Sequence, residues 1–144
     1  MKVSLSVSCG TLMPIGLVVD WGPRNDKAEA RPLLAKTAAV VQPEVLYADA
    51  GYDGEWLHRY CREDWGVRSW IKAPIYRKDG KRGGTYRSLM TPRRLKRAGY
   101  GQRWHVESFI GGLKRTTGSG LTSRHTASLF QEAGLRVLAY AMRR

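Results

Sequence analysis

The chain has 144 residues, the length of one domain, and its 25 Lys and Arg outnumber 12 Asp and Glu to give a net charge of +13. This excess of positive charge indicates a polyanionic partner, and nucleic acid is the leading class. Two cysteines are too few for a disulfide framework, and no apolar run reaches the roughly 18 to 20 residues of a membrane-spanning helix. We therefore expect no membrane partner and a cytoplasmic location.

The amino-terminal segment, residues 2–20, predicts a β-hairpin. Apolar residues alternate with serines from Val3 to Cys9, which is the period of a strand with one buried face. Gly10 and Thr11 then mark a turn, and a second apolar run follows it. The hairpin is the first element of an α/β pattern that continues along the chain.

A helix and a short strand are predicted next. Asp26 and Glu29 fit a capping box at the start of the helix, and residues 45–48 form an apolar strand that ends at Asp49. The reactive crevice of an open α/β sheet lies at the carboxyl ends of its strands, so Asp49 is a candidate catalytic residue. An isolated Asp at such a position is more often a cap or turn former, and both interpretations stay open at this point.

The second half of the chain contains a basic segment and two helices. Residues 76–99 are crowded with Lys, Arg and Gly and include a single acid, Asp79. This composition predicts a basic connector that is poorly ordered without its ligand. Residues 100–115 predict one helix and residues 126–144 a second. The order of strands and helices is typical of an α/β domain with a mixed sheet.

The helix predicted over residues 100–115 carries a polar stripe. At about 100° per residue, four polar residues share a narrow arc beside the face that the helix buries: Tyr100, Arg103, Glu107 and Lys114. Glu107 is the second candidate catalytic residue, because carboxylates that converge from different elements hold hard cations such as Mg²⁺. The alternative is an ordinary surface ion pair between Glu107 and Arg103, worth about 0.3 kcal/mol.

The spacing of these four residues, Y-x2-R-x3-E-x6-K, resembles the YREK signature of bacterial insertion-sequence transposases of the DDE class. The segment "YADAGYD" around Asp49 is similar to the part of that family with the second acidic residue, and the similarity extends over essentially the whole chain. The resemblance implies a ribonuclease H-like fold in which three carboxylates and two Mg²⁺ or Mn²⁺ ions cut and rejoin DNA. It also implies specific roles in this chain. Asp49 and Glu107 would be catalytic metal ligands, and the residues in contact with DNA would be Tyr100, Arg103 and Lys114, with the adjacent Arg115 as a further candidate.

The sequence departs from the family pattern at its start. The family's first aspartate lies on a central strand upstream of the hairpin, whereas this chain begins at the hairpin. We therefore expect a ribonuclease H-like mixed sheet that is truncated at its amino terminus and lacks its first, central strand, so that the chain alone is inactive. The expected partners are DNA, as transposon ends and target, and candidate protein partners are an upstream-encoded transposase fragment and a second copy of the chain. The alternative function is a non-catalytic, basic DNA-binding remnant of a decayed or divided transposase gene.

Overall fold

The structure is a computed structural model that describes residues 1–22, 25–75 and 78–144, and it divides into two compact units. Unit 1 comprises Met1–Arg24, Pro32–Val40 and Trp104–Arg144. Unit 2 comprises Asn25–Arg31 and Val41–Arg103. Each unit contains a two-stranded sheet and its own apolar cluster. Over the described ranges, no helix is both long enough and apolar enough to span a bilayer.

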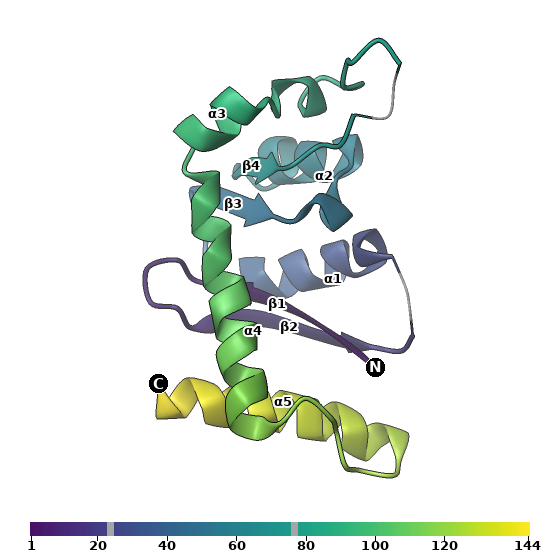
Figure 1. Cartoon of the computed structure of the whole chain (residues 1–144), viewed down its shortest axis with the longest axis vertical. Helices are drawn as coiled ribbons and strands as arrows, with labels where there is room; N and C mark the ends of the chain where they lie inside the picture. The colour runs from purple at the N-terminus through teal and green to yellow at the C-terminus, as the bar shows by residue number, and fades with distance from the viewer. Residues whose placement is uncertain (23–24, 76–77) are drawn as a thin grey trace. The chain divides into compact units, whose positions relative to one another are not determined.

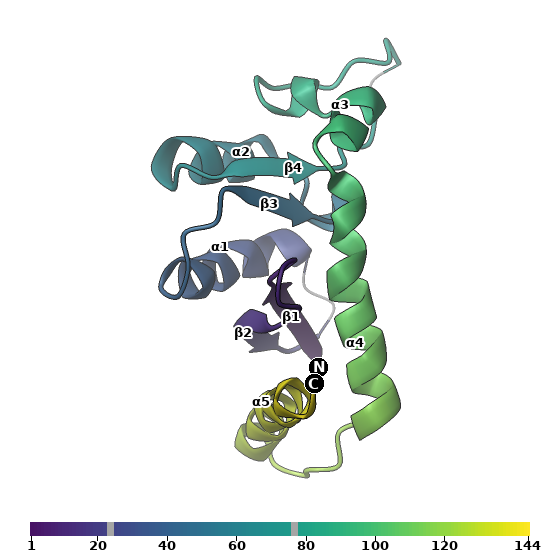
Figure 2. The same ribbon diagram turned by 90° about the vertical axis from the view of Figure 1, so that its left-hand side faces the viewer.

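Unit 1 is built on an antiparallel hairpin. Its strands are β1 (Lys2–Val7) and β2 (Pro14–Asp20). Their pairing shifts register between Ser6 and Val7, where Ile15 is left between the paired residues Pro14 and Gly16. Helices α4 (Trp104–Thr117) and α5 (Thr126–Arg143) pack on this hairpin, as both views of the chain show (Figures 1 and 2). The hairpin therefore anchors the helix that carries Glu107.

The core of unit 1 fixes which face of α4 is buried. Phe109 is fully buried between the hairpin and α5, where it meets Val137 and the partly buried Leu17. Gly112 of α4 lies so close to α5 that a Cβ at this position would collide with the hydroxyl of Tyr140. A glycine costs a helix about 1 kcal/mol relative to alanine, and here the close approach of a neighbouring helix explains its use.

Helix α1 (Asp26–Ala38) starts with a cap that differs from the predicted one. The side-chain Oδ1 of Asn25 accepts a hydrogen bond from the amide of Lys27 at 3.2 Å, so Asn25 is the cap and Asp26 is the first helical residue. The cap therefore lies one residue before the predicted one, and the predicted capping box does not form because Ala28, not Glu29, is the third helical residue. Asn and Asp cap helices about equally well, so sequence alone does not choose between neighbours.

Unit 2 is built on a parallel pair of strands. Strands β3 (Val45–Ala48) and β4 (Arg68–Ile71) pair in register, so their carboxyl ends lie together. The chain passes between them through helix α2 (Glu55–Arg59), and Figure 2 shows the two arrows pointing the same way with α2 beside them. This β-α-β arrangement places the residue that follows β3, Asp49, at a shared strand end.

The α/β class predicted from the sequence is confirmed, but its sheets differ from the prediction. The described residues form two separate two-stranded sheets, one antiparallel and one parallel, in place of one mixed sheet. Hydrophobic patterns identify strands, whereas the pairing of strands depends on contacts that are distant in the sequence. A single ribonuclease H-like sheet remains a proposal.

The basic segment is more ordered than the sequence predicts. Residues 76 and 77 lie outside the described residues. Beyond them, Arg87–Leu89 form a 3₁₀ turn and Pro92–Arg97 form helix α3. Apolar residues in and around this segment form a buried cluster in unit 2, consisting of Ala73, Met90 and Leu95. A few apolar residues thus hold a segment that its overall composition assigns to an irregular connector.

The helix predicted over residues 100–115 is divided in the structure. Tyr100–Arg103 form a 3₁₀ turn, η4, in unit 2, and α4 begins at Trp104 in unit 1. A 3₁₀ turn has about 3.0 residues per turn, so the arc calculated for a single α-helix does not extend across residue 103. Within α4, Glu107 and Lys114 are seven residues apart and both are exposed.

Candidate active site

Asp49 follows β3 and begins a tight turn. Its side-chain Oδ1 accepts a hydrogen bond from the amide of Ala50 at 2.7 Å, which caps the 3₁₀ turn η1 (Ala50–Tyr52). The side chain is nevertheless 64% exposed. The structure therefore shows the capping role, and the exposed carboxylate is accessible to a ligand as well.

Tyr100 joins η4 to the ends of both strands in unit 2. Its hydroxyl donates a hydrogen bond to the carbonyl oxygen of Ala48 at 2.9 Å, and its ring meets Tyr47 edge-on with centroids 6.4 Å apart. Burial raises the pKa of Tyr100, and a hydrogen bond from the amide of Lys72 acts in the opposite direction. The hydroxyl thus contacts the chain directly after β4 as well as the end of β3.

Arg103 brings a positive charge to the same strand ends. Its Nη1 lies 3.9 Å from Oδ1 of Asp49, and its Cζ lies 5.9 Å from the centroid of the Tyr100 ring. The structure therefore brings together three of the residues singled out in the sequence, Asp49, Tyr100 and Arg103. A carboxylate beside a guanidinium can hold a cation on one side and a phosphate oxygen on the other.

The remaining predicted site residues belong to unit 1. Glu107 lies in the first turn of α4, and Lys114 and Arg115 lie in its last turn. All three are exposed. They share one helix, which offers a carboxylate at one end and two cations at the other. The convergence of Glu107 with Asp49 stays a prediction.

Two acids close to the site in the sequence, the buried Asp53 and the half-buried Glu55, form a cluster with the basic segment that was not predicted. Asp53 forms an ion pair with Arg87 in which Nη2 to Oδ2 measures 2.7 Å and Nε to Oδ1 measures 2.9 Å. Glu55 accepts hydrogen bonds from the amides of Tyr86 and Arg87, each at 3.0 Å. Burial favours a raised pKa for Glu55, but the amides of Arg87, Tyr86 and Thr85 outweigh it and the pKa is lowered.

This cluster explains why the basic segment is ordered, since two carboxylates hold its 3₁₀ turn. Asp53 could have been noticed in the sequence because it lies four residues after Asp49 in "YADAGYD". No local signal identifies Arg87 as its partner, because the two residues are 34 positions apart.

The carboxylates of unit 2 differ in their fit to a divalent cation. Asp49 offers exposed oxygens at a strand end, the donor type that Mg²⁺ prefers. Asp53 does not fit, because both of its oxygens accept hydrogen bonds from Arg87 and its side chain is only 5% exposed. Within residues 1–22, 25–75 and 78–144, no group of three or more His, Cys, Asp or Glu could hold a metal ion. Donor chemistry therefore favours Asp49 in unit 2.

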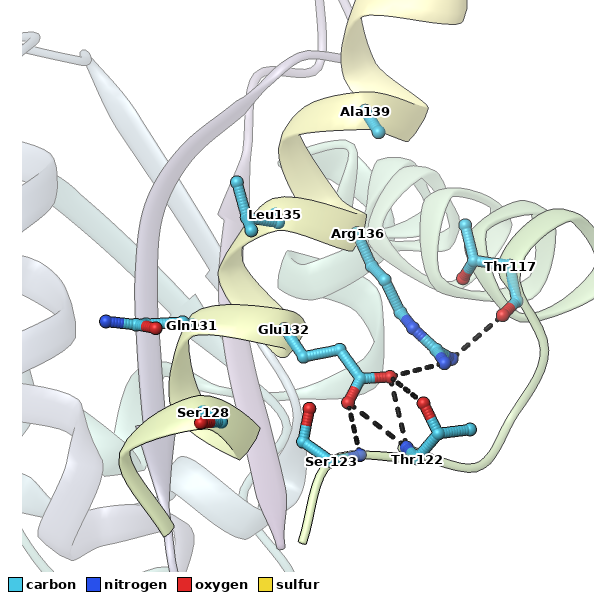
Figure 3. Close-up of a pocket in the computed structure, with 9 residues that line it drawn as sticks. All are labelled: Thr117, Thr122, Ser123, Ser128, Gln131, Glu132, Leu135, Arg136 and Ala139. Carbon is cyan, nitrogen blue, oxygen red and sulfur yellow. Dashed lines mark hydrogen bonds and ion pairs between the residues drawn. The ribbon is translucent and has the colours of Figure 1, made fainter. Parts of the chain in front are cut away.

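An open pocket on unit 1 lies beside α5 (Figure 3). Its Glu132 accepts hydrogen bonds from the amides of Thr122 at 3.1 Å and Ser123 at 2.9 Å, and it pairs with Arg136 at 2.5 Å. Hydrogen bonds from Ser123 and Thr122 lower the pKa of Glu132 to about 2. Arg136 also donates to the carbonyl oxygen of Thr117 at 2.8 Å. Both charged groups bind the loop between α4 and α5, so this pocket has a structural role.

The chain matches a known protein family over nearly its whole length. Residues 1–142 match a family model described as "Transposase DDE domain". The match includes the elements of both units and every residue singled out as a candidate in the sequence. No curated protein and no solved structure matches the chain.

Proposed function

Because the chain belongs to the transposase DDE domain family, we propose that it acts in DNA transposition as a YREK-type enzyme that cuts and joins phosphodiester bonds with divalent metal ions. Members of the family act on DNA and normally use divalent metals. The observation that carries the proposal is the strand end in unit 2, where the exposed Asp49 carboxylate lies beside the Arg103 guanidinium.

Asp49 and Glu107 are the proposed metal ligands and catalytic residues. When bound, two Mg²⁺ or Mn²⁺ ions would activate the attacking oxygen and stabilise the leaving oxygen of a phosphoryl transfer. Asp49 is held for this role by the amide of Ala50, which fixes one carboxylate oxygen. Glu107 extends from a helix whose opposite face is anchored by Phe109.

The proposed DNA contacts come from four residues. Arg103 can donate two parallel hydrogen bonds to phosphate oxygens, which a guanidinium does better than an ammonium group. Lys114 and Arg115 add exposed positive charge on α4. Tyr100 is the fourth residue. Its hydroxyl already bonds Ala48, so we expect it to position Arg103 and to meet DNA with its ring.

The fold and the partners complete the proposal. We propose a ribonuclease H-like sheet that is completed by a strand with a third carboxylate. That strand could come from an upstream-encoded transposase fragment, and a homodimer is the other proposed assembly. Two ligands alone would leave one metal position short of oxygen donors, so the lone chain is expected to bind Mn²⁺ weakly and not to cleave DNA.

The second candidate function is a basic DNA-binding protein without catalysis. The observation in its favour is that the described residues contain no three-ligand group, while the net charge of the chain is +13. Such a protein would bind DNA through phosphates, with a steep dependence on salt and little dependence on sequence.

The test compares Mn²⁺ binding and cleavage of transposon-end DNA by this chain and by a version extended upstream to include a strand with an aspartate. We expect cleavage only by the extended version. Asp49→Asn and Glu107→Gln should each abolish it, and each should weaken Mn²⁺ binding by more than the roughly 10- to 100-fold typical of outer-shell changes. Glu44→Gln is the matched control, because this carboxylate is 91% exposed and lies outside the proposed site.

Two outcomes would contradict parts of the proposal. If neither version cleaves DNA although both bind it, the non-catalytic alternative is favoured. If the lone chain cleaves DNA and Glu107→Gln stops it, the third ligand lies within the chain, and Asp20 is the first residue to test.

A further inference from the structure

A second pocket, in unit 2, combines a cationic rim with an apolar floor. The rim consists of Lys72, Arg82 and Lys96, which come from three different segments of the chain. The floor is formed by Pro92 and by Tyr100, which packs against the buried cluster of Ala73, Met90 and Leu95. This pocket has no part in the metal site proposed above, although Tyr100 lines one side of it.

The rim is suited to an anion. Lys72 and Lys96 are exposed, and Arg82 is half-buried with its Nε donating to the carbonyl oxygen of Ala73 at 2.9 Å. That bond orients the guanidinium and leaves its other N–H groups for a ligand. No acidic side chain lines the pocket in the described part of the chain. Three cations that share a pocket repel one another, and an anion between them would remove this cost.

The apolar floor adds a second requirement that the ligand must meet. Met90 has no exposed surface, and Ala73 and Leu95 are 2% and 7% exposed, so these three residues support the floor from below. The apolar surface that a ligand can reach belongs to the exposed Pro92 and the half-buried Tyr100. A free phosphate ion would satisfy the rim but not cover the apolar floor. A nucleotide unit carries both a phosphate and an apolar sugar face, so it matches the rim and the floor together.

We propose that this pocket binds one nucleotide unit of duplex DNA, with its phosphate on the rim and its deoxyribose against the floor. The inference rests on the proposed function only in taking DNA as the substrate. Tyr100 connects the two sites, because it lines the pocket and its hydroxyl donates a hydrogen bond to Ala48, the residue before Asp49. A strand held in the pocket is thereby held next to the strand end that carries Asp49.

The first experiment measures acetylation of individual lysines by mass spectrometry, with and without duplex DNA, in EDTA. Lys27 is the internal control, because it is exposed, belongs to unit 2 and does not line the pocket. DNA should slow the acetylation of Lys72 and Lys96 several-fold and leave Lys27 unchanged. Equal protection of all three lysines, or none at Lys72 and Lys96, would overturn the proposal.

Inorganic phosphate at the same total phosphate concentration distinguishes the two sources of the anion. It should protect Lys72 and Lys96 much less than duplex DNA does. Equal protection by inorganic phosphate would overturn the assignment to a nucleotide unit.

The second experiment measures DNA affinity against salt for the Lys72→Gln/Lys96→Gln variant and for Lys27→Gln. The double variant should lower the log-log slope by about 0.9, the value for one phosphate, with the same effect on two unrelated duplexes. An unchanged slope, or an equal change in Lys27→Gln, would contradict the proposal.

Both experiments run without metal, so they are independent of cleavage. Cleavage is measured with the extended version described above. Its loss in Asp49→Asn without lysine protection would refute the pocket alone, and lysine protection without an effect of Asp49→Asn on cleavage would refute the metal site alone.

Discussion

Two Asp–Arg pairs in unit 2 lie at the two ends of one short turn, and they differ in distance and in exposure. Asp49 precedes η1 and its Oδ1 lies 3.9 Å from Arg103, with side chains 64% and 25% exposed. Asp53 follows η1 and lies 2.7 Å from Arg87, with side chains 5% and 19% exposed. The same residue types therefore form an open pair and a closed pair four residues apart.

The difference in exposure and distance indicates which pair can bind a ligand. A buried, fully hydrogen-bonded pair leaves no oxygen for a ligand, and breaking it leaves an uncompensated charge in the interior. An exposed pair at nearly 4 Å contributes little to stability, and its groups can exchange partners at low cost. We therefore assign the closed pair to the fold and the open pair to the proposed site.

The largest effect is expected from breaking the closed pair. Arg87→Ala should lower the free energy of unfolding by about 3 to 5 kcal/mol, because it leaves Asp53 buried without its partner. Urea denaturation at pH 7.5 measures the change. The control is Arg93→Ala, which removes an exposed arginine of α3 and should change stability by less than about 0.5 kcal/mol. Similar losses in the two variants would show that the pairing of Arg87 with Asp53 is not what stabilises the fold.

An intermediate effect is expected from acid, through a histidine beside the closed pair. Burial, together with the charge of Arg62, lowers the pKa of His58 to about 4, while Asp53 and Glu55 act to raise it. Its Nδ1 lies 2.7 Å from the hydroxyl of Ser69. His58 binds a proton near pH 6.5 in the unfolded chain but only near pH 4 in the folded one. Its contribution to the free energy of unfolding is therefore fully present above pH 6.5 and is lost as the pH falls toward 4.

When the pH is lowered from 7.5 to 5, the preferential protonation of His58 in the unfolded chain should reduce the free energy of unfolding by about 2 kcal/mol. Urea denaturation at both pH values measures the loss. His58→Gln should reduce the difference between the two pH values, and His125→Gln, at an exposed position, should preserve it. An undiminished difference in His58→Gln would assign the acid sensitivity to other groups.

The smallest effect on stability is expected at the open pair. Asp49→Asn removes the charge next to Arg103, but an asparagine still accepts a hydrogen bond from the amide of Ala50 and still caps the turn. The free energy of unfolding should therefore change by less than about 1 kcal/mol. If Asp49→Asn costs as much as Arg87→Ala, Asp49 belongs to the fold and any loss of activity would follow from unfolding.

Sequence reasoning went furthest where the signal was local. The period of two from Val3 to Cys9 predicts a strand, and an apolar run before Asp49 predicts the strand that ends there. The prediction of one continuous helix differs from the structure at residues 100–103, because a 3₁₀ turn followed by an α-helix has nearly the same local composition as one continuous helix. The structure also differs from the prediction in the basic segment, where the burial of Met90 and Leu95 orders a stretch that is otherwise rich in charged residues.

The sequence by itself determined the α/β class, the positions of most helices and strands, the positive charge and the family, because each is written in composition, periodicity or spacing. Only the tertiary structure decided that Arg103 lies beside Asp49, that Arg87 closes on Asp53, and that three distant cations surround one pocket. The two ion pairs join residues 54 and 34 positions apart, and the three cations come from separate segments of the chain. Burial and partner geometry, which no local pattern encodes, decide whether such a charge holds the fold together or meets a ligand.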